Sequence, residues 1–208
     1  MVEEPLGTAL PHMKIGVLAI QGDYEAHGAV LKRLGAEVVF VRKPEQLDAI
    51  DAIVIPGGES STLLNFLSEG GFLEKLRDFV RAKPAFGTCA GAILLAQDVE
   101  NPPQPSLAAM DICVRRNAFG RQLESSIHQE QTKLGAQPLE MVFIRAPRIV
   151  RTGKNVEVLA WESGDPVLVR QGKVMACTFH PELSADTRVH EAFLRLVRGF
   201  GEERSASG

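Results

Sequence analysis

The chain has few of the features that mark membrane, secreted or metal-binding proteins. No apolar run approaches the roughly 20 residues that a membrane helix needs, although 45% of the 208 residues are hydrophobic. The only cysteines, Cys89, Cys113 and Cys177, cannot all pair with one another and show no metal-ligand spacing. Residues 1–12 lack the basic and apolar segments of a secretory signal. We therefore expect a cytoplasmic protein with free thiols and no metal.

Charge of either sign is not in excess. The chain has 23 Lys and Arg residues against 26 Asp and Glu residues, which gives a formal net charge of −3. This balance provides no electrostatic reason to expect a nucleic acid or an anionic membrane as a partner. Internal repeats, coiled-coil heptads and low-complexity segments are also missing. The length and the ordinary composition predict a globular protein with one domain.

The first half of the sequence alternates strands with helices. Strands are predicted from four short apolar runs, at residues 15–20, 38–41, 52–55 and 85–87. Helices are predicted between them, at residues 23–34, from about 61, at 73–81 and at 90–96. Strands that alternate with helices indicate a parallel sheet covered on both sides.

The pattern changes after a proline-rich loop at residues 101–105. Antiparallel strands and hairpins are predicted from short runs at 112–114, 141–144, 156–160, 167–169 and 174–178, with Gln171-Gly172 as one turn. A last helix is predicted at 186–199. We expect a three-layer α/β fold, doubly wound on a mostly parallel sheet with a small antiparallel extension. The single domain spans residues 13–200, between a loose N-terminal extension at 1–12 and a frayed tail at 201–208.

Residues 87–91 (Gly-Thr-Cys-Ala-Gly) lie between a predicted strand and a predicted helix. This is the pattern of a nucleophile elbow, with cysteine where hydrolases often have serine. The glycines permit the strained turn, and the start of a helix favours the thiolate of Cys89. An isolated cysteine is more often buried and inert, but the flanking glycines favour a nucleophile here.

His180 is the histidine best placed to act as a base. It follows the predicted strand at 174–178, and strand ends are where α/β sheets present catalytic groups. Glu182 is two residues further on, where its carboxylate can hold the imidazole tautomer. Alone, a His-Pro-Glu sequence is more often a capped turn. The other histidines have less suitable places: His27 and His190 lie on helices that look ordinary, His128 in an irregular polar stretch and His12 in the loose extension.

Residues 56–62 (Pro-Gly-Gly-Glu-Ser-Ser-Thr) form a third candidate element. They also connect a strand to a helix, so their backbone N–H groups are free to face a ligand. The N–H groups of Gly58 and Ala90 are candidate donors of an oxyanion hole. The same residues also suit an ordinary helix cap. The Lys-Ser/Thr ending of a phosphate-binding loop is missing.

Together, the cysteine elbow, the His-Pro-Glu sequence and the Pro-Gly-Gly loop resemble class I glutamine amidotransferases of the triad type. Further motifs narrow the similarity to glutaminase subunits of pyridoxal 5′-phosphate synthase: Leu-Ala-Ile-Gln-Gly at 18–22, Arg-Asn-Ala-Phe-Gly-Arg-Gln at 116–122 and Phe-Ile-Arg-Ala-Pro at 143–147. The resemblance covers residues 13 to about 200. The stretch 123–139 departs from the family pattern but carries no motif residue.

The resemblance implies a catalytic triad with Cys89 as nucleophile and His180 with Glu182 as relay. Its implied glutamine contacts are Gly57, Gly58, Glu59, Arg116, Ile144 and Arg145. Free L-glutamine carries an α-carboxylate and an α-ammonium group, so its site needs one cation and one anion. The resemblance also implies that no cofactor is needed and that a larger synthase barrel is the partner. That partner takes the ammonia and makes pyridoxal 5′-phosphate.

Three alternatives remain open from the sequence. One is a glutaminase that supplies ammonia to another synthase, against which the motifs at 116–122 and 143–147 argue. Another is a stand-alone thiol hydrolase, such as a γ-glutamyl hydrolase or a peptidase, which would be fully active without a partner. The third is a non-catalytic binding module with a fossil elbow, against which the complete triad argues.

Overall fold

Parallel strands form the centre of the molecule. The computed structural model describes residues 13–117 and 125–206. All neighbours in the central block of the main sheet are parallel, in the order β2 (Glu37–Val41), β1 (Lys14–Leu18), β3 (Ala52–Ile55), β4 (Ala85–Thr88) and β12 (Val174–Cys177). The apolar runs at 38–41, 52–55 and 85–87 therefore predicted strands correctly. The predicted strand at 15–20 is also present, but it ends at Leu18.

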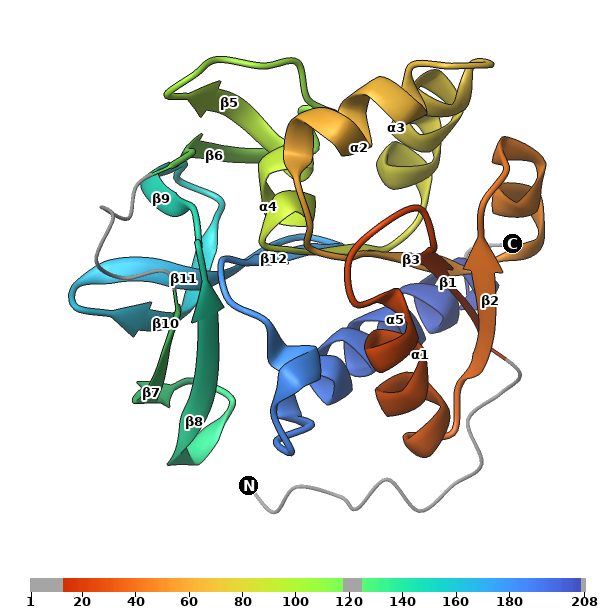
Figure 1. Cartoon of the computed structure of the whole chain (residues 1–208). Helices are drawn as coiled ribbons and strands as arrows, with labels where there is room; N and C mark the ends of the chain where they lie inside the picture. The colour runs from red at the N-terminus through yellow and green to blue at the C-terminus, as the bar shows by residue number, and fades with distance from the viewer. Residues whose placement is uncertain (1–12, 118–124, 207–208) are drawn as a thin grey trace.

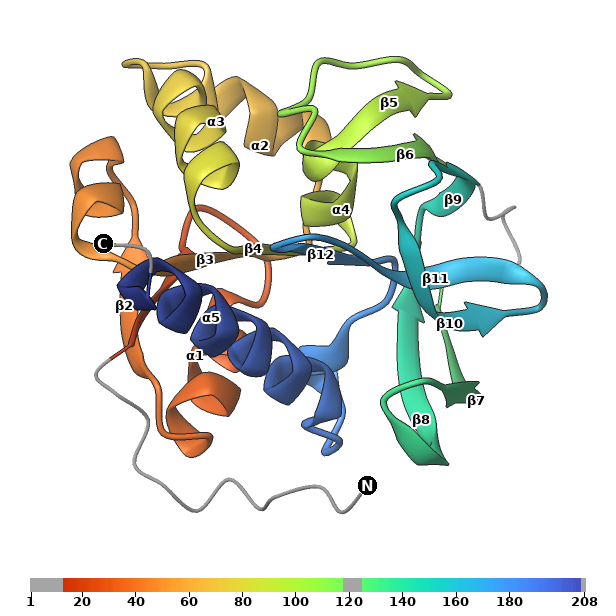
Figure 2. The same cartoon turned by 180° about the vertical axis from the view of Figure 1, so that it is seen from behind.

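Helices cover both faces of this block (Figures 1 and 2). One face carries α2 (Ser60–Leu67), α3 (Phe72–Ala82) and α4 (Ala90–Leu95), and the other carries α1 (Tyr24–Arg33) and α5 (Arg188–Ala206). Alternate side chains of β3 show the layering, because Ile53 and Ile55 enter one hydrophobic core while Ala52 and Val54 enter the other. The three-layer α/β fold expected from the sequence is confirmed.

The main sheet continues as antiparallel strands beyond β12. They follow in the order β11 (Asp165–Gln171), β10 (Glu157–Glu162), β7 (Ser125–Thr132) and β8 (Gly135–Ile144). A separate three-stranded sheet contains β5 (Ala96–Glu100), β6 (Met110–Arg115) and β9 (Arg148–Thr152). Gly172, with a φ of 56°, makes the predicted turn between β11 and β12. The strands from β11 to β8 are the antiparallel extension that the sequence predicts, whereas in the small sheet β6 pairs antiparallel with β9 but parallel with β5.

Several local features differ from the predictions. β12 pairs antiparallel with β11, as predicted, but its other neighbour is β4, with which it pairs in parallel, so it also completes the central block. His128 lies within β7 and not in an irregular stretch. β7 has a polar face and an exposed end, so it lacks the apolar run that marks a strand. β5 and β9 were not predicted either, and two short 3₁₀ helices, η1 (Pro44–Ala49) and η2 (Pro181–Leu183), lie in the connections.

The C-terminal helix is longer than predicted. It continues to Ala206, so the expectation of a frayed tail does not hold for residues 201–206. Contacts within the helix support this extension, because Arg204 stacks on the Phe200 ring and the Ser205 hydroxyl donates to the carbonyl of Gly201. The expected loose extension at 1–12 and the last two residues, 207–208, lie outside the described residues. None of the described helices has the length and hydrophobicity that crossing a membrane requires.

Candidate active site

The predicted site residues meet at the carboxyl edge of the parallel strands. β1, β3, β4 and β12 lead at this edge to Gln21, Gly57, Cys89 and His180, respectively. A pocket of about 260 Å³ opens there. Its lining includes most of the predicted residues: Gly58, Glu59, Cys89, Arg116, Ile144, Arg145 and His180. Residues taken from distant parts of the chain are therefore brought together, as parallel topology requires.

The strand-to-helix turn at Cys89 has the geometry of a nucleophile elbow. Cys89 is the N-cap of α4 and has a positive φ of 49°, which is rare outside glycine. A Cβ atom on Gly91 would overlap the carbonyl of Ile55, and one on Gly87 would lie 2.5 Å from the backbone of Gly91. The glycines are thus required by close packing under the turn, which holds the strained cysteine at the pocket.

His180 and Glu182 form a buried dyad. His180 Nδ1 lies 2.8 Å from Glu182 Oε1, and the two side chains are 7% and 0% exposed. The backbone N–H of His180 also donates to the carbonyl of Val142 on β8, over 2.8 Å. With a proton on Nδ1 donated to the carboxylate, the other ring nitrogen is left for the nucleophile. This is the orientation that a relay needs.

Charge around the dyad favours an imidazolium next to a carboxylate. Burial alone would raise the pKa of Glu182, but the neighbouring His27 and His180 hold it well below the usual value. Burial alone would lower the pKa of His180, but hydrogen bonding to Cys89 and Glu182 raises it to about 10. His180 is therefore able to carry a proton and to give it to a leaving group.

The loop at residues 56–62 acts as a helix cap, as one of its two predicted roles required. The carboxylate of Glu59 accepts hydrogen bonds from the backbone N–H groups of Ser61 and Thr62, over 3.0 and 2.6 Å. Burial opposes ionisation, but the hydrogen bonds from Thr62 and Ser61 together outweigh it and lower the pKa of Glu59 to about 2. The anion predicted for the site is therefore present at neutral pH.

The first part of this loop is packed against residues 21–22. Gln21 Nε2 donates to the carbonyl of Glu59 over 2.8 Å, and a Cβ atom on Gly22 would overlap the carbonyl of Gly57. Gly58 has a φ of +124°, a conformation that other L-residues rarely adopt. Gly57 is buried against the triad, because a Cβ atom there would lie 2.6 Å from His180 Cε1. Ala90, the other predicted oxyanion donor, is the buried first residue of α4.

The two predicted arginines differ in their surroundings. Arg116 is 9% exposed, donates to the hydroxyl of Ser61 over 2.7 Å and lies 3.3 Å from the carboxylate of Glu59. Arg145 is exposed and has a positive φ of 43°, at the end of β8. Strained residues of this kind gather at functional sites. The rest of the motif at 116–122, from residue 118 onward, lies outside the described residues.

Two histidines outside the predicted site lie directly behind the dyad. His27 of α1 and His190 of α5 are fully buried, with His27 Nδ1 3.0 Å from His190 Nε2. His27 Nε2 is 3.2 Å from both Glu182 Oε2 and Thr88 Oγ1. The interpretation of these histidines as ordinary helix residues is therefore wrong. Their helical spacing was the available signal: Val30 and Leu31 share the buried face of His27, as Phe193 and Leu194 share that of His190.

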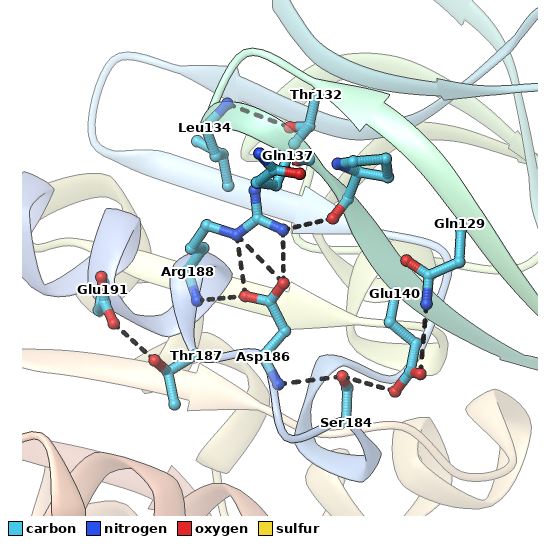
Figure 3. A network of polar contacts seen from close by, with 11 residues as sticks. Gln129, Thr132, Leu134, Gln137, Glu140, Ser184, Asp186, Thr187, Arg188 and Glu191 are labelled. Carbon is cyan, nitrogen blue, oxygen red and sulfur yellow. Dashed lines mark hydrogen bonds and ion pairs between the residues drawn. The ribbon is translucent and has the colours of Figure 1, made fainter.

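A polar network anchors the segment that follows the dyad (Figure 3). Arg188, at the start of α5, donates to the carbonyls of Gln137 and Pro138 on β8, over 2.7 and 2.6 Å. The Ser184 hydroxyl donates to the carboxylate of Glu140 on the same strand, over 2.8 Å. The antiparallel extension thus holds the segment after Glu182 in place.

Two clusters of metal-type ligands occur among the described residues. One contains Asp23, His180 and Glu182, and the other contains His128, Glu130 and Glu162. In the first, the facing atoms of His180 and Glu182 are joined by the hydrogen bond of the dyad. The second lies on β7 and β10, apart from the pocket residues. The pocket chemistry is therefore that of a thiol, an imidazole and a carboxylate.

Comparison with known proteins agrees with this geometry. The model of the SNO glutamine amidotransferase family matches residues 17–199. Pyridoxal 5′-phosphate synthase subunit PdxT of Koribacter versatilis (strain Ellin345) is 64% identical over 186 residues, which cover 89% of this chain and 96% of the relative. The protein of the same name from Thermotoga sp. (strain RQ2) is 51% identical over 188 residues, which cover 89% of this chain and all of the relative.

A solved structure described as a glutamine amidotransferase is also similar. It superimposes with a TM-score of 0.83 at 48% identity, over 88% of this chain and 98% of that one. Since the family model spans most of the chain and the relatives are covered almost completely, this chain belongs to the SNO glutamine amidotransferase family.

Proposed function

We propose that this chain is the glutaminase subunit of a pyridoxal 5′-phosphate synthase. It hydrolyses L-glutamine to L-glutamate and ammonia, and the ammonia passes to a partner synthase subunit. The observation that carries the proposal is one pocket that joins Cys89 and His180 to a cation, Arg116, and an anion, Glu59. The relatives at 64% and 51% identity, both pyridoxal 5′-phosphate synthase subunits by name, support the pathway.

The reaction begins with the Cys89 thiolate, which attacks the side-chain amide carbon of glutamine. The new oxyanion is stabilised by the backbone N–H groups of Gly58 and Ala90. His180 then gives its proton to the leaving nitrogen, so ammonia departs and a γ-glutamyl thioester remains on Cys89. His180 next takes a proton from water, which attacks the thioester and releases glutamate. Glu182 orients His180 and stabilises its charged form throughout.

Substrate contacts follow from the same pocket. We assign the α-carboxylate of glutamine to the arginines, Arg116 and Arg145, and its α-ammonium to Glu59. Ile144, half-buried in the lining, packs against the substrate. Gly57 lies against the ring of His180 and holds the loop close to the triad. No metal or cofactor takes part in these steps. The need for a reduced nucleophilic thiol suits the cytoplasm, where disulfides are rare.

The partner synthase, we propose, binds over the carboxyl edge of the sheet. Gln21, Gly58 and Cys89 are all at this edge, so a bound partner would cover the pocket and receive ammonia before it is protonated in bulk water. Because Gly57 and Gly58 have no side chains, their shared peptide is free to change orientation when the partner binds. Docking would then complete the oxyanion hole.

One experiment tests this function. Glutamate release is measured at a fixed concentration of the chain while the concentration of its cognate synthase is raised, with Cys89→Ala as the blank. We expect a low rate for the chain alone and an increase of about 10²–10³-fold at saturating synthase, which is the rate effect of one oxyanion-hole donor. Full activity without the synthase would instead favour a stand-alone thiol hydrolase. No activity in either case would reject the function.

A further inference from the structure

Behind the dyad, buried polar side chains form a continuous line across three elements. His180 is the N-cap residue of η2 and Glu182 lies within η2, His27 belongs to α1 and His190 to α5. The steps along the line are 2.8 Å from His180 Nδ1 to Glu182 Oε1, 3.2 Å from Glu182 Oε2 to His27 Nε2, and 3.0 Å from His27 Nδ1 to His190 Nε2. The polar contacts of the dyad therefore continue beyond the Glu182 carboxylate to His27 and His190.

The hydrogen-bonding groups determine where the protons of this line lie. Among the described residues, His190 Nδ1 is buried without a hydrogen-bond partner. A proton there would be an unpaired buried donor, which is costly, so the proton belongs on Nε2 and is donated to His27 Nδ1. His27 then carries its own proton on Nε2, which faces Glu182 and Thr88. Burial and the adjacent His27 lower the pKa of His190 to about 3, in agreement with a neutral ring.

Glu182 has a specific need for this N–H group. Its side chain is fully buried, and Oε1 is already used by His180. Within the described part of the chain, Oε2 makes no hydrogen bond of good geometry, and His27 Nε2 at 3.2 Å is its ion-pair contact. The same nitrogen lies 3.2 Å from Thr88 Oγ1, one residue before Cys89, so its N–H group is directed between the Thr88 hydroxyl and Glu182 Oε2. His27 therefore joins the relay to the elbow of the nucleophile.

We infer that His27 is a positioning residue for the relay: held by His190, it directs an N–H group at the second carboxylate oxygen of Glu182 and so fixes the carboxylate that orients His180. This inference rests on the proposed glutaminase function for its kinetic consequences. His27 does not line the pocket, so it acts through Glu182 and not on glutamine. The base of the line is rigid, because the first turn of α5 is anchored to β8 by Arg188 (Figure 3).

The test uses three variants and one matched control. His27→Leu removes both ring nitrogens within an apolar neighbourhood, and His27→Gln returns an N–H donor near the position of Nε2. His190→Leu leaves His27 in place but removes the donor that sets its tautomer. His128→Leu is the control, since His128 is a histidine on β7 without contact to the relay. Thermal unfolding is recorded for each variant.

Two readouts separate positioning from general structure. The first is kcat and KM for glutamate release by the complex with the synthase. The second is the downfield proton resonance of the His180 Nδ1–H that is bonded to Glu182, assigned by its loss in His180→Asn. This resonance is measured on the chain alone without glutamine, so it remains informative if the proposed glutaminase function fails.

We expect His27→Leu to lower kcat about 10–100-fold, as loss of a group that orients a functional histidine does elsewhere, with KM within about twofold of wild type. The Nδ1–H resonance should shift upfield or broaden. His27→Gln should recover most of the wild-type kcat and most of the wild-type resonance. His190→Leu should lower kcat less than His27→Leu does, and His128→Leu should match wild type in both readouts.

A folded His27→Leu variant with wild-type kcat and an unchanged resonance would overturn the inference. A rise in KM with kcat intact, or no rescue by His27→Gln, would also overturn it. Loss of folding in every His27 and His190 variant would show that the pair is structural only. If the wild-type complex does not hydrolyse glutamine, the proposed function fails, and the resonance alone decides whether His27 positions His180.

Discussion

The two sides of the pocket are built differently. The relay side, with His180 and Glu182, is almost fully buried and is supported by a hydrogen bond from the His180 N–H to β8 and by the contact of Glu182 with α1. The loop side, with Gly58 and Glu59, is exposed and is held mainly by its own helix cap and by Gln21. Rigid packing therefore presets the acid–base chemistry, whereas the oxyanion and substrate contacts lie where glutamine and a partner can act on them.

This difference has a functional consequence. On the proposed function, a glutaminase that is active before it binds its synthase would waste glutamine, so we expect one part of the site to respond to binding. The buried relay is a poor candidate, because movement there would expose or unpair a buried carboxylate. The glycine loop can move at little steric cost. We therefore expect substitutions on the relay side to lower the rate of glutamate release equally with and without the partner. Substitutions on the loop side should mainly lower the activation by the partner.

The largest effect is expected at the nucleophile, which both sides serve. Cys89→Ala should lower glutamate release by about 10³-fold or more, in the chain alone and in the complex, because no other thiol is placed at the pocket. Cys113→Ala is the matched control, since Cys113 lies on β6 in the separate sheet. The measurement is steady-state glutamate release. Full activity of Cys89→Ala, or labelling of Cys177 before Cys89 by a glutamine-analogue electrophile, would contradict the mechanism.

Next in size are the relay variants. His180→Asn should lower kcat by about 10³-fold, since both the thiolate and the leaving ammonia depend on the imidazole. Glu182→Gln should be milder, about 10²-fold, because the amide oxygen can still accept the proton of His180 Nδ1. The remaining amide nitrogen would then face the N–H group of His27, which explains a residual loss. If Glu182→Gln were more damaging than His180→Asn, the assigned roles would be reversed.

On the loop side, Gly58→Ala should remove activation more than it removes basal activity. Alanine is strained at a φ of +124°, and its Cβ atom would lie 2.7 Å from Gln21 Nε2. We expect the synthase-stimulated rate to fall by about 10²–10³-fold, the contribution of one oxyanion donor. Gly70→Ala is the control, because Gly70 also has a positive φ but has open space around it. A fully activated Gly58→Ala variant would exclude the loop as the responsive element.

The smallest effects separate the two arginines of the pocket. Arg145→Ala should raise KM for glutamine about tenfold, the loss of one charge-assisted contact, without changing the melting temperature, because Arg145 is exposed. Arg116→Ala should raise KM similarly and also lower the free energy of unfolding by about 1–3 kcal/mol, since its hydrogen bond to Ser61 and ion pair with Glu59 are lost. Glutamine titration and thermal unfolding measure these values. Equal destabilisation by both variants would contradict the assignment.

Much of this protein follows from the sequence by itself. The parallel strands, the elbow at Cys89 and the dyad of His180 and Glu182 were predictable, because each depends on residues close together in the chain. An apolar run makes a strand, glycines permit a tight turn, and a short spacing places Glu182 beside His180. The motifs further along the chain pointed to the family for the same reason, since each is a contiguous segment.

Other features were decided only by tertiary structure. β7 has too few apolar residues to be predicted as a strand from the sequence, and it is a strand because it pairs with β8 and β10. β12 looked like one more antiparallel strand, but it completes the parallel block because β4 is its other neighbour. The contact between His27 and His190 joins residues 163 positions apart. No local pattern encodes such a pairing, because it arises from two helices packed on the same face of one sheet.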